Sequence, residues 1–160
     1  MRDELALYTE EIVSFFATKD LAVEVISKDF NSYSYKSQQC VVSINLKERQ
    51  MERRALGIQP INVIVTLAQF DLIAMPGCCG IVISTNCWVL HRLQGLGIGQ
   101  FLHKLRLKIA KEWGYGLLMC TDVDTNKRQK HILEKHGWKQ LQQFNNPRTG
   151  NDVNIHTIVL

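Results

Sequence analysis

The sequence reads QGLGIG from Gln94 to Gly99, and this run is its strongest indication of a fold. An apolar, β-rich stretch at residues 81–93 precedes it, and an amphipathic helical pattern at residues 98–113 follows it. A glycine turn between a strand and a helix leaves several backbone N–H groups unpaired at the positive end of the helix dipole. Glycine also permits the backbone angles and the close approach that such a site needs. The run therefore predicts a turn that binds phosphate oxygens.

Spacing separates the known kinds of phosphate-binding turn. A P-loop closes on a Lys-Ser/Thr pair, and none follows this run. The dinucleotide fingerprint G-x-G-x-x-G also fails, because Gln100 and Leu102 stand where its last glycine would be. The pattern that fits is Gln/Arg-x-x-Gly-x-Gly/Ala, with Gln94, Gly97 and Gly99 at its fixed positions.

A second block adds specificity to this pattern. Asn126 is followed eleven and twelve positions later by Gly137 and Trp138, at the end of a helical segment. Together, the two blocks at residues 88–138 resemble the core motifs of the GNAT N-acetyltransferase superfamily. The resemblance implies an α/β (α+β) GNAT fold: a mixed, mostly antiparallel sheet of about seven strands, with about four helices, that parts between strands four and five.

The resemblance also implies a site for acetyl-CoA as co-substrate. The pantetheine arm would pair with the fourth strand, and the pyrophosphate would lie on the glycine turn. Asn126 would contact an amide of the arm, cap its helix, or do both. The basic residues after it would face a phosphate of the coenzyme or form a solvated surface. The predicted contacts are Val89, Leu90, His91, Gln94, Gly95, Leu96, Gly97, Ile98, Gly99, Asn126 and Lys130.

The catalytic residues are less clear from the sequence. Leu133 stands where the family often has a tyrosine that acts as general acid. A thiol with a pKa of about 8.5 is a good leaving group, so this loss need not abolish acyl transfer. Asp122 and Asp124 follow the predicted fifth strand and are candidate general bases, although each also suits a cap or a turn.

Composition bounds the class of protein. A chain of 160 residues with 46% hydrophobic and 21% charged residues predicts one soluble domain, residues 1–160. The net charge of +4 does not require a nucleic acid partner, and a cofactor with phosphates would account for it. The five cysteines form no zinc or disulfide pattern. We expect no metal, no membrane span and a cytoplasmic location.

Hydrophobic periodicity gives a coarse map of the elements. The predicted helices are at residues 3–18, 47–56, 98–113 and 126–136. The predicted strands are at residues 21–27, 34–46, 61–67, 81–90, 117–120 and 138–144, with a last strand that ends at Val159 after the loop 145–151.

Three functions follow from these observations. The first is transfer of an acetyl group from acetyl-CoA to an unidentified primary amine, by direct attack in a ternary complex. The second is acyl transfer to nucleic acid or to a basic protein surface, suggested by the basic segment Lys47–Arg54 and by Arg148. The third is an acyl-CoA-binding module without catalysis, suggested by Leu133. The acceptor, and whether the protein is a monomer or a homodimer, stay open at this point.

Overall fold

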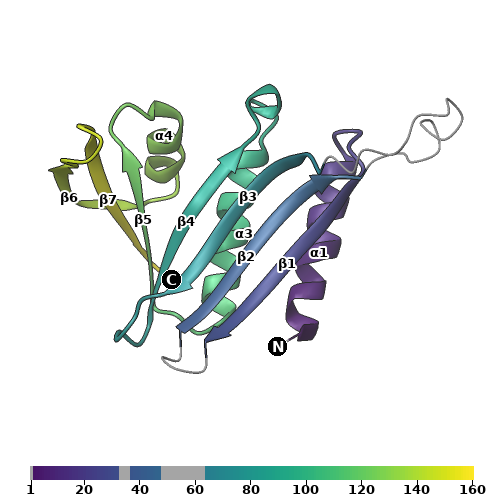
Figure 1. The fold of residues 1–160 in the computed structure, drawn as a ribbon, viewed down its shortest axis with the longest axis horizontal. Coiled ribbons are helices and arrows are strands. Elements are labelled where there is room, and N and C mark those ends of the chain that lie inside the picture. Colours follow the sequence, from purple (N-terminus) through teal and green to yellow (C-terminus); the bar gives the residue numbers. More distant parts are fainter. Residues whose placement is uncertain (1, 33–36, 48–63) are drawn as a thin grey trace, which may run out of the picture.

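The computed structural model describes residues 2–32, 37–47 and 64–160, which form one seven-stranded sheet, three α-helices and one short 3-10 helix (Figure 1). The strand order is β1-β2-β3-β4-β5-β7-β6, and only β4 and β5 pair in parallel. The predicted mixed, mostly antiparallel sheet is confirmed. In chain order the elements are α1 (Arg2–Ala17), β1 (Val23–Ser32), β2 (Ser37–Leu46), β3 (Thr66–Ala74), β4 (Ile81–Val89), η1 (His91–Leu93), α3 (Ile98–Glu112), β5 (Leu117–Val123), α4 (Lys127–Lys135), β6 (Lys139–Asn145) and β7 (Asp152–Val159).

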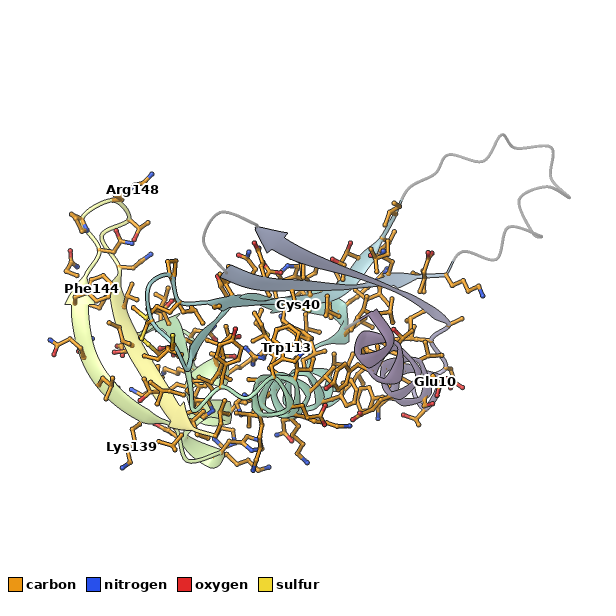
Figure 2. The ribbon with its side chains drawn as sticks, turned by 90° about the horizontal axis from the view of Figure 1, so that it is seen from below. Glu10, Cys40, Trp113, Lys139, Phe144 and Arg148 are labelled. Atoms are coloured by element: carbon orange, nitrogen blue, oxygen red, sulfur yellow. The ribbon has the colours of Figure 1, made fainter. Side chains whose placement is uncertain are left out.

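Two helices cover one side of the first four strands. The rings of Phe15 in α1 and Phe101 in α3 are stacked, with centroids 4.0 Å apart, so the two helices lie side by side. Figure 2 shows both helices on one side of β1–β4, and no helix of the described chain on the other. Side chains alternate between the two faces of a strand, and those on the face that the helices cover form the apolar core. Its fully buried members include Cys40, Val42, Ile44, Phe70, Leu72 and Val82.

The opposite side is here called the helix-free face. Cross-strand pairing places Val41, Asp71 and Thr85 in one row across it. The neighbouring rows contain Ser43, Gln69, Ile73 and Ile83. The β6–β7 hairpin, with Phe144 and Arg148, rises on this side of the sheet (Figure 2). The helix-free face is therefore more polar than the covered side.

Strands β4 and β5 stay paired for only part of their length. Residues 81–84 of β4 pair with residues 117–120 of β5, and the two strands then diverge (Figure 1). Beyond Ser84, the edge of β4 toward β5 has no strand partner in the described chain. The predicted parting between strands four and five is therefore confirmed.

Helix α3 follows the glycine turn, as the sequence predicts. Its buried stripe contains Ile98, Leu102, Leu105 and Ile109, and its lysines face solvent. The stripe also includes His103 and Arg106, which sequence periodicity did not assign to the core.

Several predicted boundaries were wrong. The strand predicted at residues 61–67 is β3, which begins at Thr66 and continues to Ala74. Gln69 and Asp71 lie within it, because a strand with one polar face accommodates polar residues. The strand predicted at residues 117–120 continues to Val123, so Asp122 lies within β5. Strand β1 likewise extends beyond the predicted end, to Ser32. The helix predicted at residues 47–56 lies outside the described residues, apart from its first residue, which is not helical.

Candidate functional site

The glycine turn presents a run of free backbone donors. In the described chain, the amides of residues 95–100 donate to no backbone or side-chain acceptor, whereas the Phe101 amide already bonds to the Gly97 carbonyl at 3.0 Å. Gly97 is the N-cap of α3 and provides no side-chain cap. Six consecutive unpaired amides at a helix N-terminus form a seat for an anion.

Two glycines give the turn its shape. Gly95 and Gly97 have φ values of 90° and 81°, in the left-handed region that other residues rarely adopt. No heavy atom lies within 4 Å of the position that a Cβ would occupy on either residue. Ile98 is 1% exposed and anchors the turn in the core, while Leu96 is 44% exposed. The turn is therefore held to the core through Ile98 and exposed to solvent at Leu96.

Gln94 links this turn to its two neighbours. Its side-chain nitrogen donates to the Val89 carbonyl at 3.2 Å, and its side-chain oxygen accepts a hydrogen bond from Arg128 of α4. Arg128 thus brings a positive charge beside the glycine turn. The sequence predicted basic residues after Asn126 that would face a phosphate or solvent, and its contact with Gln94 places Arg128 next to the turn. His91 is exposed and begins η1.

The end of β4 differs in part from the prediction. We had expected the Leu90 backbone to be available to a ligand. Its amide instead donates to the Leu67 carbonyl at 2.8 Å. Pairing with β3 consumes it because antiparallel strands alternate between bonded and outward-facing residues. The same alternation turns the backbone groups of Val89 toward the open edge of β4. Contact of Val89 with a ligand stays a prediction, whereas the Leu90 amide is already bonded to β3.

Asn126 is the N-cap of α4. Its side-chain oxygen accepts from the Gln129 amide at 3.2 Å, which confirms the capping interpretation. Its side-chain nitrogen has no partner in the described chain and remains available as a donor. Lys130 lies 3.8 Å from Asp124, so its charge is partly compensated.

The two candidate bases have different surroundings. Asp122 in β5 is buried and lies 2.8 Å from Nε2 of His156 in β7, while its other oxygen has no partner in the described chain. Asp124 accepts from Asn154 at 3.3 Å and is about half exposed. Neither is a free carboxylate at the open edge of β4. His156 was not singled out from the sequence, because an isolated histidine in a strand gives no signal.

A buried polar cluster connects α3 to its surroundings. Nη1 of Arg106 donates to Ser84 Oγ of β4 at 2.6 Å, and Nε1 of Trp138 donates to Nε2 of His103 at 3.2 Å. Burial, together with the charge of Arg106, lowers the pKa of His103 to about 3. Burial, together with the charges of Lys104 and Lys135, also lowers the pKa of His136, which disfavours a cationic His136 at the end of α4.

Two further side chains are closed to solvent. Leu133, at the usual tyrosine position, is 1% exposed and belongs to the core. Cys120 is also buried, and desolvation raises the pKa of its thiol to about 12, so it is a poor nucleophile.

A bulge in β4 was not predicted. Asn86 and Cys87 stand opposite the single residue Phe70 of β3, where the register shifts. Asn86 has a φ of 50°, one of two positive values among non-glycine residues in the described chain. Its side chain donates to Asp71 at 2.5 Å. Bulges and strained residues often re-aim a side chain at a functional site. A polar residue in mid-strand was the only sequence signal for Asp71.

Comparison with solved structures identifies the fold. The IAA acetyltransferase from Bacillus cereus has a TM-score of 0.58 and 15% identity, over 86% of this chain and 100% of its own. A protein from Desulfovibrio desulfuricans assigned to the GNAT acetyltransferase family has a TM-score of 0.57 and 15% identity, over 76% of this chain and 68% of its own. The ribosomal-protein-S18-alanine N-acetyltransferase from Escherichia coli has a TM-score of 0.52 and 12% identity, over 74% of this chain and 68% of its own.

The chain has the GNAT fold, and the resemblance seen in its sequence is confirmed at this level. No family model matches the sequence, and no curated protein matches it.

Within the described residues, no helix is long and apolar enough to span a membrane. The same residues contain no group of three or more side chains suited to hold a metal ion.

Proposed function

We propose that this protein is an acetyl-CoA-dependent N-acetyltransferase that acts on a primary amine. The observation that carries the proposal is the row of six unpaired amides at residues 95–100, beside the open edge of β4. The pyrophosphate would lie on these amides, with Arg128 and Asn126 close to the same end. The arm would extend along the outward-facing backbone at Val89 toward the bulge.

The chemistry is a direct acyl transfer. The neutral amine attacks the thioester carbon, the carbon–sulfur bond breaks, and the thiolate takes up a proton. An alkyl amine with a pKa of about 10.4 is protonated at pH 7, and removing its proton costs between about 4 and 5 kcal/mol. A base must help with this step, whereas the thiol leaves readily without a tyrosine acid. Asp122 and Asp124 stay predictions for that base.

A second candidate function is an acyl-CoA-binding module without catalysis. The burial of Leu133 at the usual acid position favours it, because no hydroxyl is supplied there. Acyl transfer to nucleic acid or to a basic protein surface remains a broader alternative for the acceptor. Steep salt dependence of RNA or DNA binding would support that alternative.

The test is a screen for thiol release from acetyl-CoA with polyamines, amino acids, aminoglycosides, peptides and nucleic acids as acceptors. We expect at least one amine to raise the rate above hydrolysis, with the acetyl amide detected by mass spectrometry. Binding of acetyl-CoA without turnover across the whole panel would instead favour the binding module.

A further inference from the structure

Asp71 lies on the helix-free face, beside the open part of β4. The direction of its side chain follows from its neighbours. Ser84 contacts Arg106 of α3 and therefore faces the helices, and Leu72 is its partner on β3. Asp71 is the next residue in β3, so its side chain faces the opposite way. Its own partner on β4 is Thr85, the first residue past the end of the β4–β5 pairing.

The Asp71 carboxylate is held by neutral donors. It is 4% exposed, and it accepts from Asn86 Nδ2 at 2.5 Å and from Gln69 Nε2 at 3.5 Å. No lysine or arginine whose side chain the structure describes forms an ion pair with it. A carboxylate has about four acceptor positions and gains most from a charged donor when it is removed from water. Among the described side chains, the carboxylate therefore has hydrogen-bond donors but no cationic partner.

The bulge directs this carboxylate toward the place where the strands part. Asn86 supplies the shorter hydrogen bond and has the strained backbone, one residue after Thr85. The strain is thus located where β4 is free of β5 and where the thioester of a ligand running along β4 would lie. From Val89 back to Thr85 the strand spans about 13 Å, so the carboxylate and the phosphate seat are at opposite ends of the same edge.

An aromatic side chain completes the surroundings. Trp88 is opposite Gln69 in the register, lies on the helix-free face and is 40% exposed. Asp71 is the charged side chain described in its cross-strand row, in which Lys28 of β1 also stands by its pairing with Val41, whereas Glu24 lies further along β1 on the same face. The Asp71 carboxylate and the exposed indole of Trp88 are groups that attract an organic ammonium ion.

We propose that the acceptor site is the helix-free face around Asp71 and Trp88, and that it takes a cationic primary amine. This inference rests on the proposed function. The ammonium donates a hydrogen bond to Asp71 and transfers one proton to the carboxylate. The resulting neutral nitrogen attacks the thioester carbon, the carbon–sulfur bond breaks, and the thiolate takes the second proton from nitrogen. Asp71 then releases its proton to water, so that one amide, one thiol and one proton are formed.

Asp71 suits this role better than Asp122. Cys120 is the partner of Ser84 and so lies on the covered side, and Asp122 follows it two residues later in β5 on that same side. Asp122 also has His156 as a close partner, at 2.8 Å. An acceptor that reaches the thioester from the helix-free face would meet Asp71 first.

The test compares Asp71→Asn with Glu24→Gln, a matched change of an acidic residue on the same face. Butylamine, which is protonated at pH 7, and aniline, which is neutral, serve as acceptors in a thiol-release assay. We expect Asp71→Asn to lower kcat/KM for butylamine by about 10²–10⁴-fold and for aniline by less than about tenfold. Glu24→Gln should change neither value by more than about twofold. An equal loss with both acceptors, or no loss, would overturn the proposal.

Direct binding separates this proposal from the function on which it rests. In titrations of the protein saturated with coenzyme A, we expect butylamine to bind wild type at least about tenfold more tightly than Asp71→Asn. Unchanged coenzyme A affinity in the variant would show that it is folded. Normal coenzyme A binding without butylamine binding would overturn the acceptor site alone. Absence of coenzyme A binding to wild type would overturn the proposed function and the acceptor site with it.

Discussion

Asn126 uses the two ends of its amide in different ways. The oxygen caps α4 through the Gln129 amide at 3.2 Å, while the nitrogen has no partner in the described chain. The sequence alone left the capping role and the ligand role open, because either would place an asparagine there. The two roles can be separated by changing one end of the side chain at a time.

Replacing Asn126 by Ser should keep the cap, because the hydroxyl oxygen can accept from the Gln129 amide, and should remove the side-chain amide nitrogen. We expect Asn126→Ser to leave the free energy of unfolding within about 0.5 kcal/mol of wild type, whereas Asn126→Ala should lose about 1 kcal/mol. Both variants should bind acetyl-CoA more weakly, measured by calorimetry next to thermal unfolding. If Asn126→Ser binds acetyl-CoA as wild type does, Asn126 only caps the helix.

At the scale of elements, α3 is fastened to the sheet by a buried arginine. Arg106 donates to Ser84 Oγ at 2.6 Å and to the Leu102 carbonyl at 3.3 Å, and is itself 2% exposed. Ser84 is also the last residue of β4 that pairs with β5. The Arg106 side chain therefore connects α3, which begins at the glycine turn, with the point where β4 and β5 part.

Removing this hydroxyl should destabilise the fold. We expect Ser84→Ala to lower the free energy of unfolding by between about 1 and 3 kcal/mol, because a buried charged donor loses its acceptor. Ser84→Thr retains a hydroxyl and should lose less. Urea denaturation measures both. Equal stability of Ser84→Ala and wild type would mean that water replaces the hydroxyl.

The sequence predicted the elements around the glycine turn well. Strong helical periodicity and two glycines with special backbone angles specify α3 and the turn locally. Strand β3 was misplaced because its polar residues face the helix-free side, a fact that depends on the neighbouring strands. Asp71 was missed for the same reason. Its partners Asn86 and Gln69 meet only through the register and the bulge, which leave no trace in local sequence.

At the scale of the whole molecule, two histidines with lowered pKa values should make stability depend on pH. The pKa of His103 falls to about 3 because of burial and the neighbouring Arg106, and the pKa of His136 is also lowered. In the unfolded chain both groups titrate near 6.5. Between these pKa values the unfolded state binds more protons, so stability increases with pH.

We expect the free energy of unfolding to rise with pH from about 4 to about 6.5, by up to about 1.4 kcal/mol per unit from His103. Above that range neither histidine should make the free energy of unfolding depend on pH. His103→Gln retains an acceptor for Trp138 and should flatten the slope. Urea denaturation at several pH values measures it. An unchanged slope in His103→Gln would show that His103 does not cause the dependence.

The central claim is that the open amides of the glycine turn bind the nucleotide end of acetyl-CoA. Calorimetric titration of acetyl-CoA into wild type and Gly97→Ala tests it most directly, because alanine at a φ of 81° costs about 1–2 kcal/mol and disturbs the turn. We predict micromolar binding to wild type and affinity about tenfold weaker, or lower still, in the variant. No binding to wild type, or equal affinity in the two proteins, would contradict the account.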